Sequence, residues 1–211
     1  MKPKNTQTWE WKGYYEYMHN RARKSMPKIA SLFEKKRAVR ILDFCCGSGG
    51  NAIYLAKKGF EVYGFDLSKD GIKIAKDGSK GLKTHFKVWS MERRLPYRSA
   101  FFDAIIIYRA LYHARIATIR KAAKEVERVT KPGGLIYMES DQGPPVIFDR
   151  ISKRVGVRTY LVDRGKDGFV YYHYFNKKEL LSLFKNCKIR RFYFKGKKYA
   201  LLAEKLNDKN V

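Results

Sequence analysis

The chain has 211 residues, of which 45% are hydrophobic and 31% charged, and its formal net charge is +26. That length and apolar content fit one compact domain, predicted over residues 1–211. No apolar run approaches the ~18 residues of a membrane-spanning helix, and residues 1–9 lack a signal-peptide core, so we expect a soluble, cytoplasmic protein. Three cysteines, two of them adjacent, exclude a disulfide framework, and their spacing predicts no metal site.

The first predicted elements are a strand, a glycine loop, a helix and a second strand. A short apolar run indicates a buried strand near 39–44, which gives way at the glycine-rich residues 47–50 to a helix near 50–59. Glycines there allow backbone angles closed to other residues, and they let a ligand approach the N–H groups at the start of the helix. The second strand, near 61–66, ends in Asp66, where an acid of a dinucleotide fold meets ribose hydroxyls. This unit predicts a nucleoside site.

Side chains in the loop distinguish between nucleoside cofactors. A dehydrogenase would carry glycines in the pattern G-x-G-x-x-G, but the third position here is Ala52, and the phosphate-loop lysine of nucleotide hydrolases is missing. Asp43 would repel a pyrophosphate, yet it can accept bonds, directly or through water, from an ammonium group. The loop therefore favours a cofactor that is cationic at one end.

Strands and helices alternate along the rest of the chain. Further strands are predicted near 84–89, 102–108, 134–140, 188–195 and 198–204, and further helices near 69–77, 115–130 and 176–186. The alternation predicts an α/β fold with a Rossmann-like, doubly wound sheet of seven strands, mostly parallel, with an antiparallel C-terminal hairpin. Two segments fall outside this core: an N-terminal arm, residues 1–38, and a cap insertion, residues 141–175.

The glycine loop belongs to a recognisable series of motifs. Asp43 is followed by two residues and then Cys-Gly-x-Gly, and the next strand ends in Asp66. In these motifs the chain resembles the class I S-adenosylmethionine-dependent methyltransferases. Later segments look like that family's fourth strand, fourth helix with fifth strand, and last helix with closing hairpin, at residues 101–108, 122–137 and 176–204. The likeness covers about residues 38–205 and implies S-adenosylmethionine as cofactor and S-adenosylhomocysteine as product.

The resemblance also implies which residues bind the cofactor. They lie in the glycine loop, after the second, third and fourth strands, and on the arm: Asp43, Cys45, Gly47, Ser48, Gly49, Asn51, Asp66, Leu67, Ser68, Ser90, Met91, Tyr108, Tyr14 and Arg23. Cys45 departs from the family pattern, because it stands where a glycine is usual. The acid usual after the third strand is also missing, so adenine would rely on Ser90, Met91 and Leu67, or on Glu92 in a shifted register. For Tyr14, Tyr15 and Arg23 the alternative is an amphipathic helix that packs on the sheet.

A catalytic base is required only if the acceptor must lose a proton, because a sulfonium donor is already activated. His113 and Tyr112 are the main candidates, since they follow the fourth strand and ligands of parallel sheets bind beyond the carboxyl ends of the strands. Further candidates are His19, Asp141 and the cluster at residues 171–174. The alternatives are structural: His113 as a helix-start residue bonded to the backbone, and the cluster as a strand packed on the core.

The charge of +26 has two interpretations, RNA binding or a solvated surface adapted for solubility or heat. Residues 1–40 carry a net +8 and residues 150–211 a net +12, whereas the cap insertion carries only +2. The basic and aromatic run at residues 190–199 can stack bases as a single-strand platform or form the closing hairpin, with Phe192 and Phe194 on one face.

Together these patterns predict a methyltransferase that transfers a methyl group by direct SN2 displacement to a small or medium-sized acceptor. The first alternative is an RNA methyltransferase acting on tRNA or rRNA. The chain lacks the Asn-Pro-Pro-Tyr or Asp-Pro-Pro-Tyr motif of adenine amino-methylating enzymes, so ribose and guanine chemistry stay open. The second alternative is a non-catalytic partner subunit that binds S-adenosylmethionine or RNA. The oligomeric state stays open.

Overall fold

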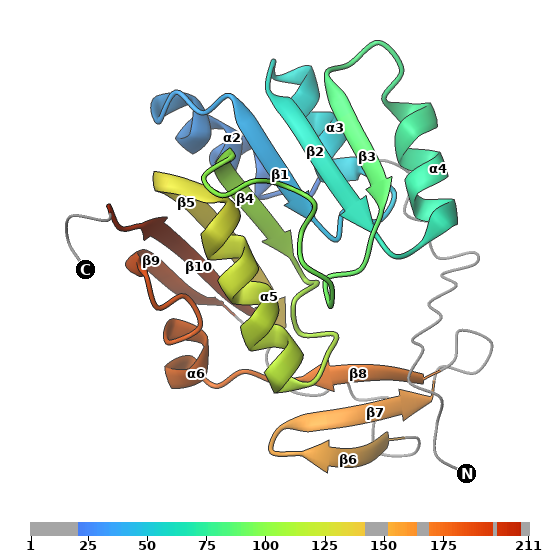
Figure 1. Cartoon of the computed structure of the whole chain (residues 1–211), viewed down its shortest axis with the longest axis vertical. Helices are drawn as coiled ribbons and strands as arrows, with labels where there is room; N and C mark the ends of the chain where they lie inside the picture. Colours follow the sequence, from blue (N-terminus) through green and yellow to red (C-terminus); the bar gives the residue numbers. More distant parts are fainter. Residues whose placement is uncertain (1–20, 142–151, 164–168, 196–197, 208–211) are drawn as a thin grey trace.

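The computed structural model describes residues 21–141, 152–163, 169–195 and 198–207. Figure 1 shows a large sheet with helices on both faces and a smaller, separate sheet at one end of the molecule. In spatial order the large sheet contains β3 (Thr84–Val88), β2 (Glu61–Asp66), β1 (Arg40–Phe44), β4 (Phe102–Tyr108), β5 (Thr130–Asp141), β10 (Lys198–Lys205) and β9 (Cys187–Lys195). β10 pairs antiparallel with β5 and β9, and the other pairs are parallel. This is the predicted seven-stranded α/β fold.

The central strands are buried on both faces, which explains their nearly continuous apolar sequence. The described helices are α2 (Met26–Lys35), α3 (Gly50–Lys57), α4 (Lys69–Gly78), α5 (Ile116–Val129) and α6 (Lys177–Leu181). Ile41 and Ile106 pack with α2 and α3, whereas Leu42 and Ile107, on the opposite face of the same strands, pack with α5. Each such side chain stabilises the fold by about 1.5–3 kcal/mol on burial. α4 contacts α3, β2 and β3.

Two predicted boundaries differ from the structure. The last helix ends at Leu181 rather than near 186, because the Asn186 backbone and side-chain N–H groups donate to the Glu127 carboxylate at 2.8 and 3.2 Å. This tertiary contact draws the chain out of the helical path. β5 begins at Thr130, directly after α5, rather than at 134, and a register shift against β4 accommodates the added residues.

The cap insertion contains a three-stranded antiparallel sheet that pattern reading did not predict, apart from its last strand. Its strands are β6 (Ser152–Gly156), β7 (Thr159–Asp163) and β8 (Phe169–His173). β8 confirms the interpretation of the cluster as a strand packed on the core, although the strand ends at His173 and Tyr174 follows it. The His173 N–H donates to the Tyr112 carbonyl at 2.8 Å, which fastens the small sheet to the loop after β4. In Figure 1 the small sheet lies at the end toward which the arrowheads of β1 and β4 point.

The arm and the closing hairpin resolve two further alternatives. α2, which was not predicted, buries Met26 and Phe33, but Arg23 precedes it, so the amphipathic-helix interpretation is wrong for that residue. Tyr14, Tyr15 and His19 lie outside the described residues. In the hairpin, the rings of Phe192 and Phe194 lie 5.5 and 5.3 Å from the ring of Tyr199, which places both on one face as predicted.

Candidate active site

The loop between β1 and α3 contains three residues with left-handed backbone angles. Cys45 has φ of 57°, Gly47 of 56° and Gly49 of 81°. At Gly49 a side chain is also excluded by space, because a Cβ would lie 2.8 Å from the Cβ of Ala75 in α4. At Cys45 the backbone is strained by about 1–2 kcal/mol. The loop is thus in close contact with α4. No side chain caps the N-terminus of α3, which follows the loop.

Asp43, at the end of β1, is a buried carboxylate next to this loop. It is 2% exposed, and no donor among the described residues reaches its Oδ2 atom. Burial raises the pKa of Asp43 to about 7, with a further contribution from the charge of Asp66 and a smaller opposing one from the Ala52 N–H. A cationic donor placed here would satisfy the oxygen and favour the ionised form. This arrangement fits a ligand that ends in an ammonium group.

Asp66, at the end of β2, holds the loop and the start of α4 together. Its Oδ2 accepts from the Gly47 N–H and its Oδ1 from the Ser68 N–H, both at 2.9 Å. Burial raises the pKa of Asp66, and these two hydrogen bonds oppose the shift. Each carboxylate oxygen has a second acceptor position. Asp66 can therefore accept from hydroxyl groups while it braces the loop.

The segment after β3 lies beside Asp66, because the Trp89 N–H donates to the Asp66 carbonyl at 2.9 Å. Met91 packs against the core, while Leu67 keeps 39% of its surface exposed. Ser90 Oγ already accepts from the Glu92 N–H at 3.2 Å, so its free function is mainly that of a donor. After β2 and β3 the chain thus offers apolar side chains and a hydroxyl, which are groups that suit a purine ring.

Three predicted cofactor residues from distant parts of the chain meet at the start of α3. The Arg23 N–H donates to Asn51 Oδ1 at 3.0 Å, and the Arg23 guanidinium lies 5.1 Å from the centre of the Tyr108 ring. Burial raises the pKa of Tyr108, and the nearby Glu139 carboxylate adds to the shift. This contact brings the described end of the arm to the carboxyl end of β4.

The two candidate bases occupy different surroundings. Tyr112 is 5% exposed and its hydroxyl donates to Asp141 Oδ2 at 3.1 Å, while burial and the Asp141 charge raise its pKa. Arg109 donates to the same oxygen through Nε at 2.8 Å and Nη2 at 2.6 Å. The His113 ring lies 4.2 Å from the ring of Tyr112 and 4.6 Å from that of Tyr172 in β8. Tyr112 is thus committed to a carboxylate, whereas His113 lies between the sheet and the cap.

Comparisons with known proteins agree with this geometry. Residues 41–134 match the model of the methyltransferase domain family. The matched segment is therefore identified as a methyltransferase domain. It is 25% identical to the PH0226 protein from Pyrococcus horikoshii OT3, with a TM-score of 0.70 over 95% of this chain and 92% of that one. An S-adenosylmethionine-dependent methyltransferase structure from Methanosarcina mazei is 26% identical, with a TM-score of 0.68 over 80% of this chain and 93% of that one.

Curated sequences match about half of this chain. The chain is 33% identical over 120 residues to the demethylmenaquinone methyltransferase of Geobacillus kaustophilus, which is 54% of this chain and 49% of that protein. The chain spans about half the length of the curated relatives it matches.

Sequence reasoning missed Arg109 as a part of the candidate site. Arg109 directly follows β4 and adopts a left-handed φ of 51°, and Asp141 ends the neighbouring parallel strand β5. This ion pair could have been predicted from the sequence, because a basic residue follows one predicted parallel strand and an acidic residue ends the neighbouring one. His173, in the predicted cluster at residues 171–174, is buried in the cap, where its ring contacts two residues that were not predicted, Thr159 Oγ1 at 2.8 Å and Glu179 Oε2 at 3.0 Å.

The three cysteines of the chain are suited to packing rather than to covalent chemistry. All three are free, and burial raises the thiol pKa of Cys45 and Cys46 well above its ordinary value, with Asp43 and Asp66 adding to the shift. The described part of the chain contains no cluster of three or more metal-ligating side chains. Nor does any described helix have the length and apolarity to cross a bilayer.

Proposed function

We propose that the chain is an S-adenosylmethionine-dependent methyltransferase whose acceptor is a small or medium-sized molecule. The observation that carries the proposal is the buried Asp43 carboxylate, whose Oδ2 lacks a donor among the described residues beside a loop shaped for a nucleoside. Asp43 would bind the ammonium of the methionine moiety, and Asp66 the ribose hydroxyls. Adenine would lie against Leu67, Ser90 and Met91.

The remaining cofactor contacts follow from neighbouring elements. The backbone of Gly47, Ser48 and Gly49 and the side chain of Cys45 would border the ligand, while the Gly47 N–H stays bonded to Asp66 and the Gly49 N–H to the Cys46 carbonyl. Arg23, Asn51 and Tyr108 would close the site at the methionine end, because they contact one another beside α3. Ser68 caps α4 through its Oγ, which accepts from the Gly71 N–H at 3.0 Å, so its contribution is to hold Asp66 in place.

When bound, S-adenosylmethionine supplies an activated methyl group that passes to the acceptor's lone pair as the carbon–sulfur bond breaks. The chain's own task is then to align the acceptor and to exclude water. If the acceptor must lose a proton, His113 is the residue proposed to take it. Tyr112 is proposed as a positioning residue, since its hydroxyl donates to Asp141 and its raised pKa disfavours the phenolate.

A small acceptor is favoured by the cap and by the relatives. The sheet of β6, β7 and β8 is fastened beside the carboxyl ends of the strands by the bond between His173 and Tyr112, which limits the size of a ligand. The Geobacillus relative is named for a quinone precursor, demethylmenaquinone. The net charge of +26 keeps RNA as the second candidate acceptor.

Donor binding and methyl transfer are tested separately. Isothermal titration with S-adenosylhomocysteine should show binding that Asp66→Ala weakens by about 1.5–3 kcal/mol, since the substitution removes charge-assisted hydrogen bonds. Asp70→Ala is the matched control, because Asp70 is an exposed carboxylate in the first turn of α4. Equal affinity in wild type and Asp66→Ala would contradict the placement of the ribose.

The acceptor class is tested with labelled S-adenosylmethionine and fractionated cell extract, with and without ribonuclease. We expect label in the low-mass fraction that survives ribonuclease. Loss of the label after ribonuclease would favour RNA instead. Donor binding without labelling of any fraction would favour the non-catalytic alternative.

A further inference from the structure

Among the described residues, no helix covers the face of the sheet over β2 and β3. In the continuous described stretch from Val88 to Phe102, the chain passes from β3 to β4 through turns, without a helix. α5 packs over the middle of the sheet on this face, and α4 lies on the other face of β3 (Figure 1). An edge strand with one uncovered face is a surface that can accept a ligand.

Aromatic rings line this uncovered face. The rings of Tyr63 in β2 and His85 in β3 are stacked, with centres 4.4 Å apart and planes 24° apart. The Tyr97 ring lies 5.8 Å from Tyr63 in an edge-on arrangement. The His85 side chain is 52% exposed, so a further planar group has access to it. The stack therefore ends in solvent rather than in the core.

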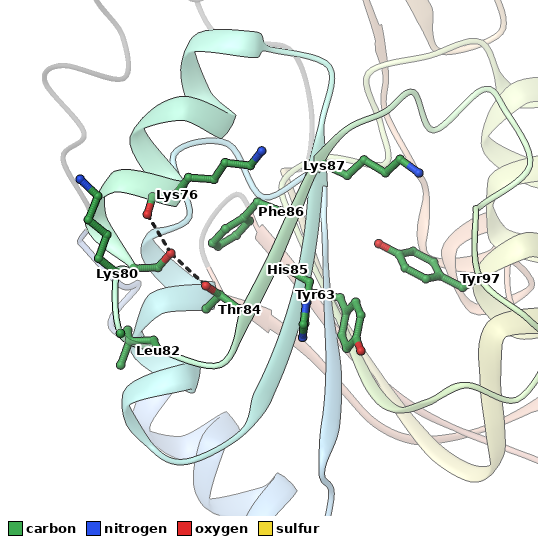
Figure 2. A pocket seen from close by; sticks show the side chains of 11 residues that line it. Tyr63, Lys76, Lys80, Leu82, Thr84, His85, Phe86, Lys87 and Tyr97 are labelled. Atoms are coloured by element: carbon green, nitrogen blue, oxygen red, sulfur yellow. Dashed lines mark hydrogen bonds between the residues drawn. The ribbon is translucent and has the colours of Figure 1, made fainter.

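A hollow of about 600 Å³ follows β3 beside these rings. Figure 2 shows Tyr63, His85, Lys87 and Tyr97 on one side of the strand and Lys76, Lys80 and Phe86 on the side of α4. Stacked rings and lysines thus line the same hollow along the edge strand β3.

The surrounding charge is strongly positive. Residues 76–98 contain seven Lys or Arg and two acidic residues, a net of +5. Lys87 and Arg93 lie 4.9 and 4.4 Å from the Trp89 ring, which holds both cations at the end of β3. The nearby Glu61 is already engaged by Tyr63 at 2.7 Å and by His85 at 3.1 Å. The free charge of this surface is cationic.

We propose that the β3 edge, defined by Tyr63, Lys83, His85 and Lys87, binds single-stranded RNA, with a base on the Tyr63–His85 stack and phosphates on the two lysines. His85 and Lys87 lie two residues apart in β3 and share its uncovered face, and Lys83 is an exposed lysine directly before the strand. A cationic track with a stacking ring is the recognition mode of single-strand binding proteins. An acidic peptide would match the charge but supplies no planar base. The site is separate from the proposed acceptor site and requires no cofactor.

The test is fluorescence anisotropy of the full chain with a labelled 20-nucleotide single-stranded RNA over a range of salt. Lys83→Gln combined with Lys87→Gln should lower the slope of log K against log salt by about 1.4, because each lost phosphate contact contributes about 0.7. The control is Lys188→Gln combined with Arg191→Gln on the exposed β9 edge, which removes the same charge and should leave the slope closer to that of wild type. An equal fall in both variants would overturn the proposal in favour of diffuse attraction.

Stacking is tested with His85→Ala and His85→Phe. His85→Ala should weaken RNA binding by between about fivefold and a hundredfold with an unchanged salt slope, and His85→Phe should restore the affinity. Because the His85 side chain is 52% exposed, both variants should remain folded, with only a small fall in unfolding temperature from the lost contact with Glu61. An abasic strand of equal length should bind more weakly than the RNA. Equal binding of the abasic strand, or no effect of His85→Ala, would overturn the proposal.

Discussion

The charge of Asp66 raises the pKa of Asp43, which burial has already raised, so that the Asp43 carboxyl titrates at about 7. We propose that these two acids bind opposite ends of one cofactor, and in the free protein at neutral pH a substantial fraction of Asp43 would be protonated. A cationic ligand at Asp43 would reverse that shift.

Cofactor affinity should accordingly increase with pH below 7. In this range binding of the ammonium displaces a proton from Asp43, so affinity should rise by up to about tenfold per pH unit and level off near 7. Titration calorimetry with S-adenosylhomocysteine between pH 5.5 and 7.5 measures this, and buffers of different ionisation enthalpy should reveal proton release. Asp43→Asn should bind weakly, with a shallower pH dependence. A flat wild-type profile would contradict an ionised Asp43 in the complex.

The stability of the free protein should change in the opposite sense. Asp43 has an ordinary pKa of 3.8 in the unfolded chain and one of about 7 in the folded protein, so the folded state holds the proton more tightly. The free energy of unfolding should therefore fall as pH rises from about 4 to about 7. Asp43→Asn removes this loss and should be more stable than wild type at pH 8, by up to about 4 kcal/mol. Urea unfolding at pH 4 and pH 8 checks it, and the prediction fails if the variant is no more stable at pH 8.

Gly49 is predicted to be the most restrictive glycine of the loop. Gly49→Ala combines a φ of 81° with a Cβ 2.8 Å from Ala75, so we expect a loss of about 2–4 kcal/mol in unfolding free energy and weaker cofactor binding. Gly81→Ala is the matched control, because its φ is 80° but nothing lies within 4 Å of the new Cβ. It should lose only about 1–2 kcal/mol. Similar losses in both variants would show that the backbone angle, and not contact with α4, decides the effect.

The two residues after β4 should have separable effects on methyl transfer. Tyr112→Phe removes the bond to Asp141, so the rate should fall less than about tenfold with an unchanged pH profile. If the acceptor loses a proton to His113, His113→Gln should lower the rate by about 10²-fold or more and remove the acidic limb of the profile. Initial rates with the labelled extract acceptor between pH 5.5 and 9 distinguish the two. A pH profile altered by Tyr112→Phe would reverse the assigned roles.

The parallel core could be predicted because local signals agree there with the global fold. The segment from Arg40 to Asp66 shows an apolar strand, a glycine turn and an acid at the strand end. Each of these features follows from neighbouring residues in the sequence, and the structure has it in the predicted place. The closing hairpin was predicted for a similar reason, since alternation along β9 places Phe192 and Phe194 on one face.

The cap and the shape of the site depended on tertiary contacts that local pattern does not encode. β6 and β7 are short and show no clear alternation of apolar residues. Thr159 is instead held by its contact with His173, and Arg158 by its ion pair with Glu179. The ion pair of Arg109 with Asp141 joins residues 32 positions apart. The end of α6 is likewise set by Glu127, from a different helix.

The two bonds that Asp66 accepts have a consequence for how the cofactor site forms. Because Gly47 and Ser68 are already held by its carboxylate, the loop after β1 and the start of α4 are in register before any ligand arrives. A cofactor that adds its hydroxyls to the same carboxylate meets a preorganised surface. Little of the binding free energy is then spent on ordering the loop, and more is left to hold the donor in line with its acceptor.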